Sequence, residues 1–248
     1  MPITPQYLKY TNRSATPERK STIIWDFYSG FDKPTDRLVQ SKHTERSVDT
    51  LTEHEPKLNS DWRNEMSRLS IVETTCECSE VQKGFEKAQK AFGMVPNFTK
   101  VLASSPVAVN AFIDYWSAMY QGKLDHSVRV RIALALSQAN ACQYCVSAHS
   151  AIAEGAGLNQ KEIELARAGA AIEAKENTAV KFARAVLEHR GDVTDNELKA
   201  MHEAGFSDGE IVEIILLVGM FSAANFIGKV SRVEIDFPAV KELSKISA

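Results

Sequence analysis

The chain has 248 residues, 44% of them hydrophobic, so it is long enough to form one sizeable core. A net charge of −3 gives no reason to expect nucleic acid or an anionic membrane as a partner. Four cysteines in two closely spaced pairs do not resemble the disulfide framework of a secreted domain, and the first residues lack the pattern of a secretory signal. We therefore expect a cytoplasmic protein.

The composition changes near residue 65. Only 18 of the first 65 residues are apolar, against 91 of the remaining 183, and the first part has no sustained helical or alternating period. Residues 1–65 are therefore expected to form a poorly structured N-terminal extension, either an appended tail or upstream sequence that is not normally translated. Residues 66–248 have the pattern of a complete domain.

Helix signals follow one another through this domain. The predicted helices run, in chain order, from Ser79 to about Phe92, from Ser105 to about Gly122, from Asp125 or His126 to Asn140, from Cys142 to Glu154, from Gln160 to Arg167, from Ala179 to His189, and onward from Thr194 and from Ser207. Ser79 can cap the first of these helices and Asn159 the one that begins at Gln160, while Thr194 and Ser207 each begin a capping-box pattern. No strand pattern of comparable length is present. The expected fold is an all-α helical bundle of eight or so helices.

The longest apolar run, from Ile211 to Ile227, is interrupted by Glu213 and Asn225 and is shorter than a membrane span normally needs. It predicts a buried core helix. The run is also richer in apolar residues than one small core usually requires, so we expect part of it to face another subunit of a homo-oligomer.

Three residues of one short stretch, Cys142, Cys145 and His149, carry most of the chemical information. Offsets of three and four residues put them on one face of a helix. A thiolate near a helix start is stabilised by the dipole and by free N–H groups, and a neighbouring thiol can condense with a sulfenic acid before it is overoxidised. The spacing is therefore typical of a redox or a metal site.

Other interpretations of this motif stay open. The residues could be packed core side chains, or three zinc ligands that need a fourth from elsewhere. Haem attachment in its usual form is excluded, because Val146 stands where a histidine must follow the second cysteine.

Several segments together resemble the carboxymuconolactone decarboxylase superfamily, and more closely its alkylhydroperoxidase D-like, peroxidase-related branch. They are residues 92–97 (FGMVPN), the helix start at 104–106 (SSP), the helix at 133–140, the motif at 142–149 (CQYCVSAH) and the closing segment at 234–238 (EIDFP). The resemblance covers roughly residues 66–240, and the Cys-X-X-Cys-X-X-X-His motif is fairly specific.

The resemblance implies an all-α fold assembled as a trimer or hexamer, a peroxidase cycle on small hydroperoxides, and a dithiol or thioredoxin-like reducing partner. It implies no metal or other cofactor. Carried over by position, Cys145 is the thiol that meets the peroxide, Cys142 the more buried resolving thiol and His149 the relay histidine.

Two positions depart from the family pattern. The relay glutamate falls at Val130, which cannot carry a proton, and the histidine often found between the cysteines falls at Tyr144, expected to be a packing residue. His126, one turn before Val130, is expected to face the same side and could substitute as a base, or it could simply lie in solvent at the helix start. The second cysteine pair, Cys76 and Cys78, is expected to be exposed and unpaired, because residues two apart in an extended chain point in opposite directions.

Two functions follow. The first is an antioxidant enzyme, a thiol peroxidase or thiol–disulfide oxidoreductase that acts through Cys145, Cys142, His149 and His126. The alternative is a non-catalytic helical oligomer or redox sensor whose dithiol oxidises without fast turnover, since the relay carboxylate is missing. A lactone decarboxylase, which the superfamily name suggests, is less favoured because that branch does not use a cysteine pair.

Overall fold

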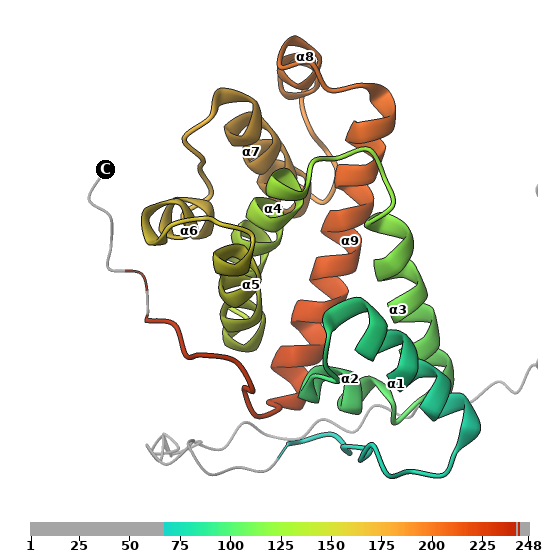
Figure 1. Cartoon of the computed structure of the whole chain (residues 1–248). Coiled ribbons are helices and arrows are strands. Elements are labelled where there is room, and N and C mark those ends of the chain that lie inside the picture. Colours follow the sequence, from blue (N-terminus) through green and yellow to red (C-terminus); the bar gives the residue numbers. More distant parts are fainter. Residues whose placement is uncertain (1–66, 242, 244–248) are drawn as a thin grey trace, which may run out of the picture. The chain divides into compact units, whose positions relative to one another are not determined.

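The computed structural model describes residues 67–241 and residue 243. In this part of the chain there are nine α-helices and no strand (Figure 1). They are α1 Ser79–Phe92, α2 Asn97–Leu102, α3 Pro106–Met119, α4 His126–Ala139, α5 Gln143–Gly155, α6 Gln160–Arg167, α7 Ala174–Glu188, α8 Asp195–Glu203 and α9 Asp208–Ser231. The all-α prediction is confirmed, whereas the expectation for residues 1–65 lies outside the described residues.

Local capping explains most helix starts. The side chains of Asn159, Thr194 and Ser207 each accept a hydrogen bond from the backbone N–H three residues later, and the glutamate at that position bonds back. Ser79 was expected to cap α1, which is wrong: it is the first helical residue, and Cys78 occupies the cap position without a side-chain hydrogen bond. Gly93 ends the same helix with a φ of 76°, a conformation that favours glycine.

Helix α4 forms the centre of one half of the bundle. Every residue from Val128 to Ser137 is buried, because α4 packs against α5, α6, α7 and α9. In Figure 1, α9 runs through the length of the domain, with α1 to α3 on one side and α4 to α7 on the other. This arrangement places the start of α5, where the cysteine motif lies, close to both α2 and α9.

A buried arginine ties three helices together. Arg131 of α4 pairs with Glu162 of α6 at 2.8 Å and with Glu176 of α7 at 3.1 Å, and its side chain is only 6% exposed. The other carboxylate oxygen of Glu162 accepts the N–H of Asn159 in the capping box of α6. Buried ion pairs of this kind are costly to break, because removal of one partner leaves a desolvated charge.

Helix α9 has two different faces. One face, with Ile214, Leu217 and Phe221, is fully buried in the core. The opposite face exposes Val212, Ile215, Leu216, Phe226 and Val230. Among the described residues, α9 alone is long and apolar enough to cross a membrane, and half of its most apolar window is buried inside the domain. The predicted core helix is therefore present, but it also carries an apolar outer face.

Candidate functional site

The connection between α4 and α5 positions the first cysteine. Ala141 turns the chain with a φ of 51°, and the N–H of Cys142 donates to the carbonyl oxygen of Ser137. Cys142 becomes the N-cap of α5, where its Sγ accepts the N–H of Cys145 at 3.3 Å. The two sulfurs form a disulfide, with the Cα atoms 5.3 Å apart. The sequence motif therefore places both cysteines at the positive end of a helix dipole.

The two cysteines differ in their surroundings. Cys145 lines a cavity of about 700 Å³, whereas Cys142 does not line it and is 1% exposed. Cys142 instead lies against α9, where a Cβ atom added to Gly228 would come within 3.0 Å of its Sγ. Helix α9 can approach the disulfide this closely because position 228 has no side chain.

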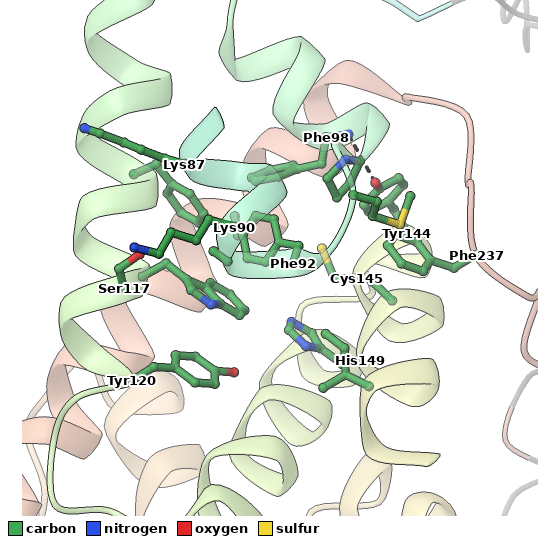
Figure 2. A pocket seen from close by; sticks show the side chains of 18 of the residues that line it. Lys87, Lys90, Phe92, Phe98, Ser117, Tyr120, Tyr144, Cys145, His149 and Phe237 are labelled. Carbon is green, nitrogen blue, oxygen red and sulfur yellow. Dashed lines mark hydrogen bonds between the residues drawn. The ribbon is translucent and has the colours of Figure 1, made fainter. Parts of the chain in front are cut away.

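His149 lies one turn further along α5, and its ring also lines the cavity. It is stacked against Trp116, with ring centroids 6.1 Å apart, and meets the edge of Phe221 at 5.1 Å. Burial among these rings lowers the pKa of His149 to about 4, since a charged imidazole would lose its hydration. His149 is therefore neutral near pH 7. Figure 2 shows the Cys145 sulfur and the His149 ring facing the same space.

The cavity wall is mainly aromatic. Phe92, Phe98, Phe112 and Trp116, which we call the aromatic wall, all line it. Their rings contact one another in sequence, with centroid distances of 5.2 Å for Phe92 and Trp116, 6.4 Å for Phe112 and Trp116, and 5.4 Å for Phe98 and Phe112. The volume of the cavity falls within the range of about 300 to 1,000 Å³ that is usual for small-molecule sites. The cavity therefore suits a small apolar ligand.

Tyr144, between the two cysteines, anchors the chain around the site. Its hydroxyl donates to Asp236 at 2.7 Å and accepts the N–H of Phe98 at 3.1 Å, while the other oxygen of Asp236 accepts the N–H of Asn97. Burial raises the pKa of Tyr144 above its ordinary value, so the phenol stays protonated. The predicted packing residue thus also joins α5 to the start of α2 and to the segment after α9.

Sequence comparison agrees with this architecture. Residues 106–189 match the family model described as the carboxymuconolactone decarboxylase family. A solved structure of an uncharacterised peroxidase-related protein with the alkylhydroperoxidase AhpD core, from Ralstonia eutropha JMP134, superposes with a TM-score of 0.63. It is 25% identical and covers 70% of this chain and 94% of its own. Residues 106–189 therefore belong to the carboxymuconolactone decarboxylase family.

Two further solved structures have a similar fold. A peroxidase-related protein from Silicibacter sp. TM1040 has a TM-score of 0.56 and 26% identity, and covers 62% of this chain and 84% of its own. The debrominase Bmp8 has the same fold, with a TM-score of 0.58 and 18% identity over 68% of this chain and 92% of its own. No curated protein matches the sequence.

Val130, at the position where the family resemblance implies a relay glutamate, lies outside the cavity. It is 1% exposed and packs in a separate apolar cluster with Leu134, Ala153 and Leu158. His126, by contrast, is exposed and lines the cavity. Of these two residues of α4, only His126 lines the cavity, because the apolar cluster covers Val130.

No Asp or Glu among the described residues lines the cavity. The cavity instead contains Tyr120, which the sequence did not mark as a site residue. Burial raises the pKa of Tyr120 to about 12, an effect opposed by the charge of Arg129. Its ring stacks on Trp116 at 5.0 Å and lies 6.1 Å from the His126 ring. Tyr120 therefore supplies a neutral phenol to the cavity. In the sequence, only its four-residue offset from Trp116 indicated that the two rings lie on the same side.

The remaining cysteines stay unpaired. Cys76 is partly buried and Cys78 exposed, with the N–H of Cys78 donating to the Cys76 sulfur at 3.3 Å. Within the part of the chain that the structure describes, no group of three or more His, Cys, Asp or Glu side chains could hold a metal ion. The zinc interpretation of the motif therefore finds no fourth ligand there.

Proposed function

We propose that this protein is a thiol peroxidase that reduces small organic hydroperoxides through Cys145 and Cys142 and is returned to its reduced state by a dithiol or thioredoxin-like partner. The observation that carries the proposal is the position of the cysteine pair. Both thiols lie at the start of α5, but only Cys145 opens onto the cavity, beside His149. A reactive thiol at the substrate and a second thiol in covalent reach of it are what such a cycle needs.

The reduced enzyme begins the cycle with a Cys145 thiolate, favoured by the N-terminal end of α5. The sulfur attacks the terminal oxygen of the hydroperoxide, so an S–O bond forms and the O–O bond breaks. The alkoxide that leaves takes up one proton and departs as the alcohol. The Cys142 thiol then attacks the Cys145 sulfenic acid and releases water, which forms the disulfide seen here. A dithiol supplies two electrons and two protons by exchange and restores both thiols.

Proton transfer has to proceed without the superfamily's glutamate. His149 is neutral and, with its pKa lowered by burial, serves as a hydrogen-bonding acceptor or donor beside Cys145 rather than as a fixed cation. His126 reaches the cavity from α4 and is our candidate for the group that protonates the leaving alkoxide. In this scheme His149 of α5 lies beside the reacting sulfur, and His126 of α4 protonates the leaving oxygen.

The test is stopped-flow mixing of the dithiol form with cumene hydroperoxide, followed by steady-state assay with a dithiol reductant. A peroxidase consumes many equivalents of peroxide per subunit. The missing carboxylate favours one competing function, a redox sensor, which would form the disulfide once and then turn over slowly. Failure of Cys145 to oxidise with excess peroxide would contradict both.

We also propose that the protein is a cytoplasmic homo-oligomer, a trimer or hexamer as in the family it belongs to. The outer face of α9, with Val212, Ile215, Leu216, Phe226 and Val230, leaves an apolar surface that association would cover. Sedimentation equilibrium at micromolar concentration tests this. A strict monomer would contradict it, and replacement of Phe226 by glutamate should lower the apparent mass of an oligomer.

A further inference from the structure

Among the described residues that line the cavity beside Cys145, there are basic, apolar and neutral polar side chains but no Asp or Glu. Of its basic lining residues, Lys87 and Lys90 come from α1, His126 from α4 and His149 from α5. His149 is neutral. Both lysines thus lie on α1 at one side of a mostly aromatic space, and Figure 2 shows Lys90 on the side of the pocket away from Cys145 and His149.

The two lysines are not equivalent. Lys87 forms an ion pair of 2.8 Å with Asp114 of α3, so its charge is already matched. Lys90 has no ion pair or hydrogen-bond partner among the described residues, and it lies at the exposed end of α1. A ligand that carries an anion can therefore use Lys90 without displacing an existing partner.

The size and lining of the cavity restrict which kind of molecule can carry this anion. Hydrogen peroxide would leave most of a cavity of about 700 Å³ unfilled, and it has no apolar body for the aromatic wall to bind. A molecule with a ring-sized apolar body can cover Phe92 and Trp116 while its reactive end lies at Cys145. Lys90 then meets the end that points away from the O–O group.

We infer that the substrate is an organic hydroperoxide with an apolar, ring-sized body and a carboxylate at the end remote from the O–O group, and that Lys90 binds this carboxylate. The inference rests on the proposed peroxidase function and adds the class of substrate. The reaction is the one written above, because the carboxylate takes no part in bond making or breaking. Lys90 is a specificity residue, whereas Cys145 and His149 remain at the reacting atoms.

A matched pair of peroxides tests the inference. Cumene hydroperoxide and its para-carboxylate differ only in the anionic group. At low ionic strength we expect the full-length enzyme to prefer the carboxylate by about fivefold in kcat/KM, the size of effect that a partly exposed ion pair gives. Lys90→Gln should bring the ratio close to one, and high salt should do the same to the wild type.

A control variant separates local from general effects of charge. Lys83→Gln removes a lysine from the same helix that pairs with Glu80 and does not line the cavity. The preference of this variant should stay at its wild-type value. A wild-type ratio near one, or a preference that survives Lys90→Gln, would overturn the assignment.

Binding of the product alcohols makes the test independent of turnover. Calorimetric titration of the oxidised protein with cumyl alcohol and with its para-carboxylate should show the same fivefold preference, lost in Lys90→Gln. If this preference is present but neither peroxide is consumed, the proposed peroxidase function fails while the ligand class stands. If both peroxides are consumed equally and both alcohols bind equally, the substrate inference fails alone.

Discussion

Burial of His149 predicts an acid-sensitive fold. Its pKa is lowered from an ordinary 6.5 to about 4 because the ring is enclosed by Trp116 and Phe221. Between these two pH values the unfolded chain binds a proton at this site that the folded protein excludes. Stability linked to His149 is therefore intact above about pH 6.5 and is lost as the pH falls toward 4.

The size of the effect follows from the shift. Lowering the pH from about 7.5 to about 5 should cost about 2 kcal/mol at this single site, and the full loss below pH 4 approaches about 3 kcal/mol. His149→Phe keeps an aromatic ring in the same position but removes the titration. Relative to this variant, the oxidised wild type should therefore lose about 2 kcal/mol of unfolding free energy over that pH interval.

Urea denaturation of the oxidised proteins at the two pH values measures this difference. His189→Gln, at the exposed histidine that ends α7, serves as the control and should follow the wild type. If the wild type and His149→Phe change in parallel, within about 0.5 kcal/mol, the imidazole is not held neutral by burial, and the reasoning is refuted.

Four further substitutions test the site and its surroundings. Cys145→Ser should abolish peroxide-dependent oxidation, whereas Cys142→Ser should react once and stop at a sulfenic acid on Cys145. Dimedone labelling and mass spectrometry detect this sulfenic acid. A dimedone label on Cys142 in the wild type would show that the two cysteines have the opposite roles. Gly228→Ala should have an unfolding free energy about 1 to 3 kcal/mol lower than that of Gly209→Ala, measured by urea denaturation. The reason is that a Cβ at position 228 comes within 3.0 Å of the Cys142 sulfur, whereas a Cβ at position 209 has only a contact at 3.9 Å. Equal unfolding free energies would show that α9 is not packed tightly against the disulfide. Val130→Glu should lower the unfolding free energy by several kcal/mol without raising the peroxidase rate, since the carboxylate would enter an apolar cluster rather than the cavity; a faster enzyme would show that the side chain reaches the site.

Local sequence signals predicted a large part of the fold. The capping boxes at Thr194 and Ser207 begin α8 and α9 as expected, because the hydrogen bonds involved join residues only three apart. Helix α2 was not predicted, since its six residues are too few to show a helical period and follow a proline. Ser79 was assigned a cap that it does not form, which shows that a capping residue type alone does not set the exact start.

The sequence predicted the cysteine motif better than it predicted the residues around the motif. Cys142, Cys145 and His149 are neighbours along one chain segment, so their spacing alone brought them together. The sequence could not show that Val130 faces a second apolar cluster while His126 faces the cavity. On a helix as completely buried as α4, hydrophobic periodicity no longer distinguishes one face from another.

What the sequence determined by itself is what depends on short-range geometry: the helical class, most helix starts and the proximity of Cys142, Cys145 and His149. The tertiary structure decided which groups share the cavity with Cys145, because Lys90, Trp116 and Tyr120 reach it from helices distant in the chain. It also decided that His149 is neutral and that Cys142 is enclosed by α9. Burial and desolvation depend on every element packed around a group, and no local pattern encodes that sum.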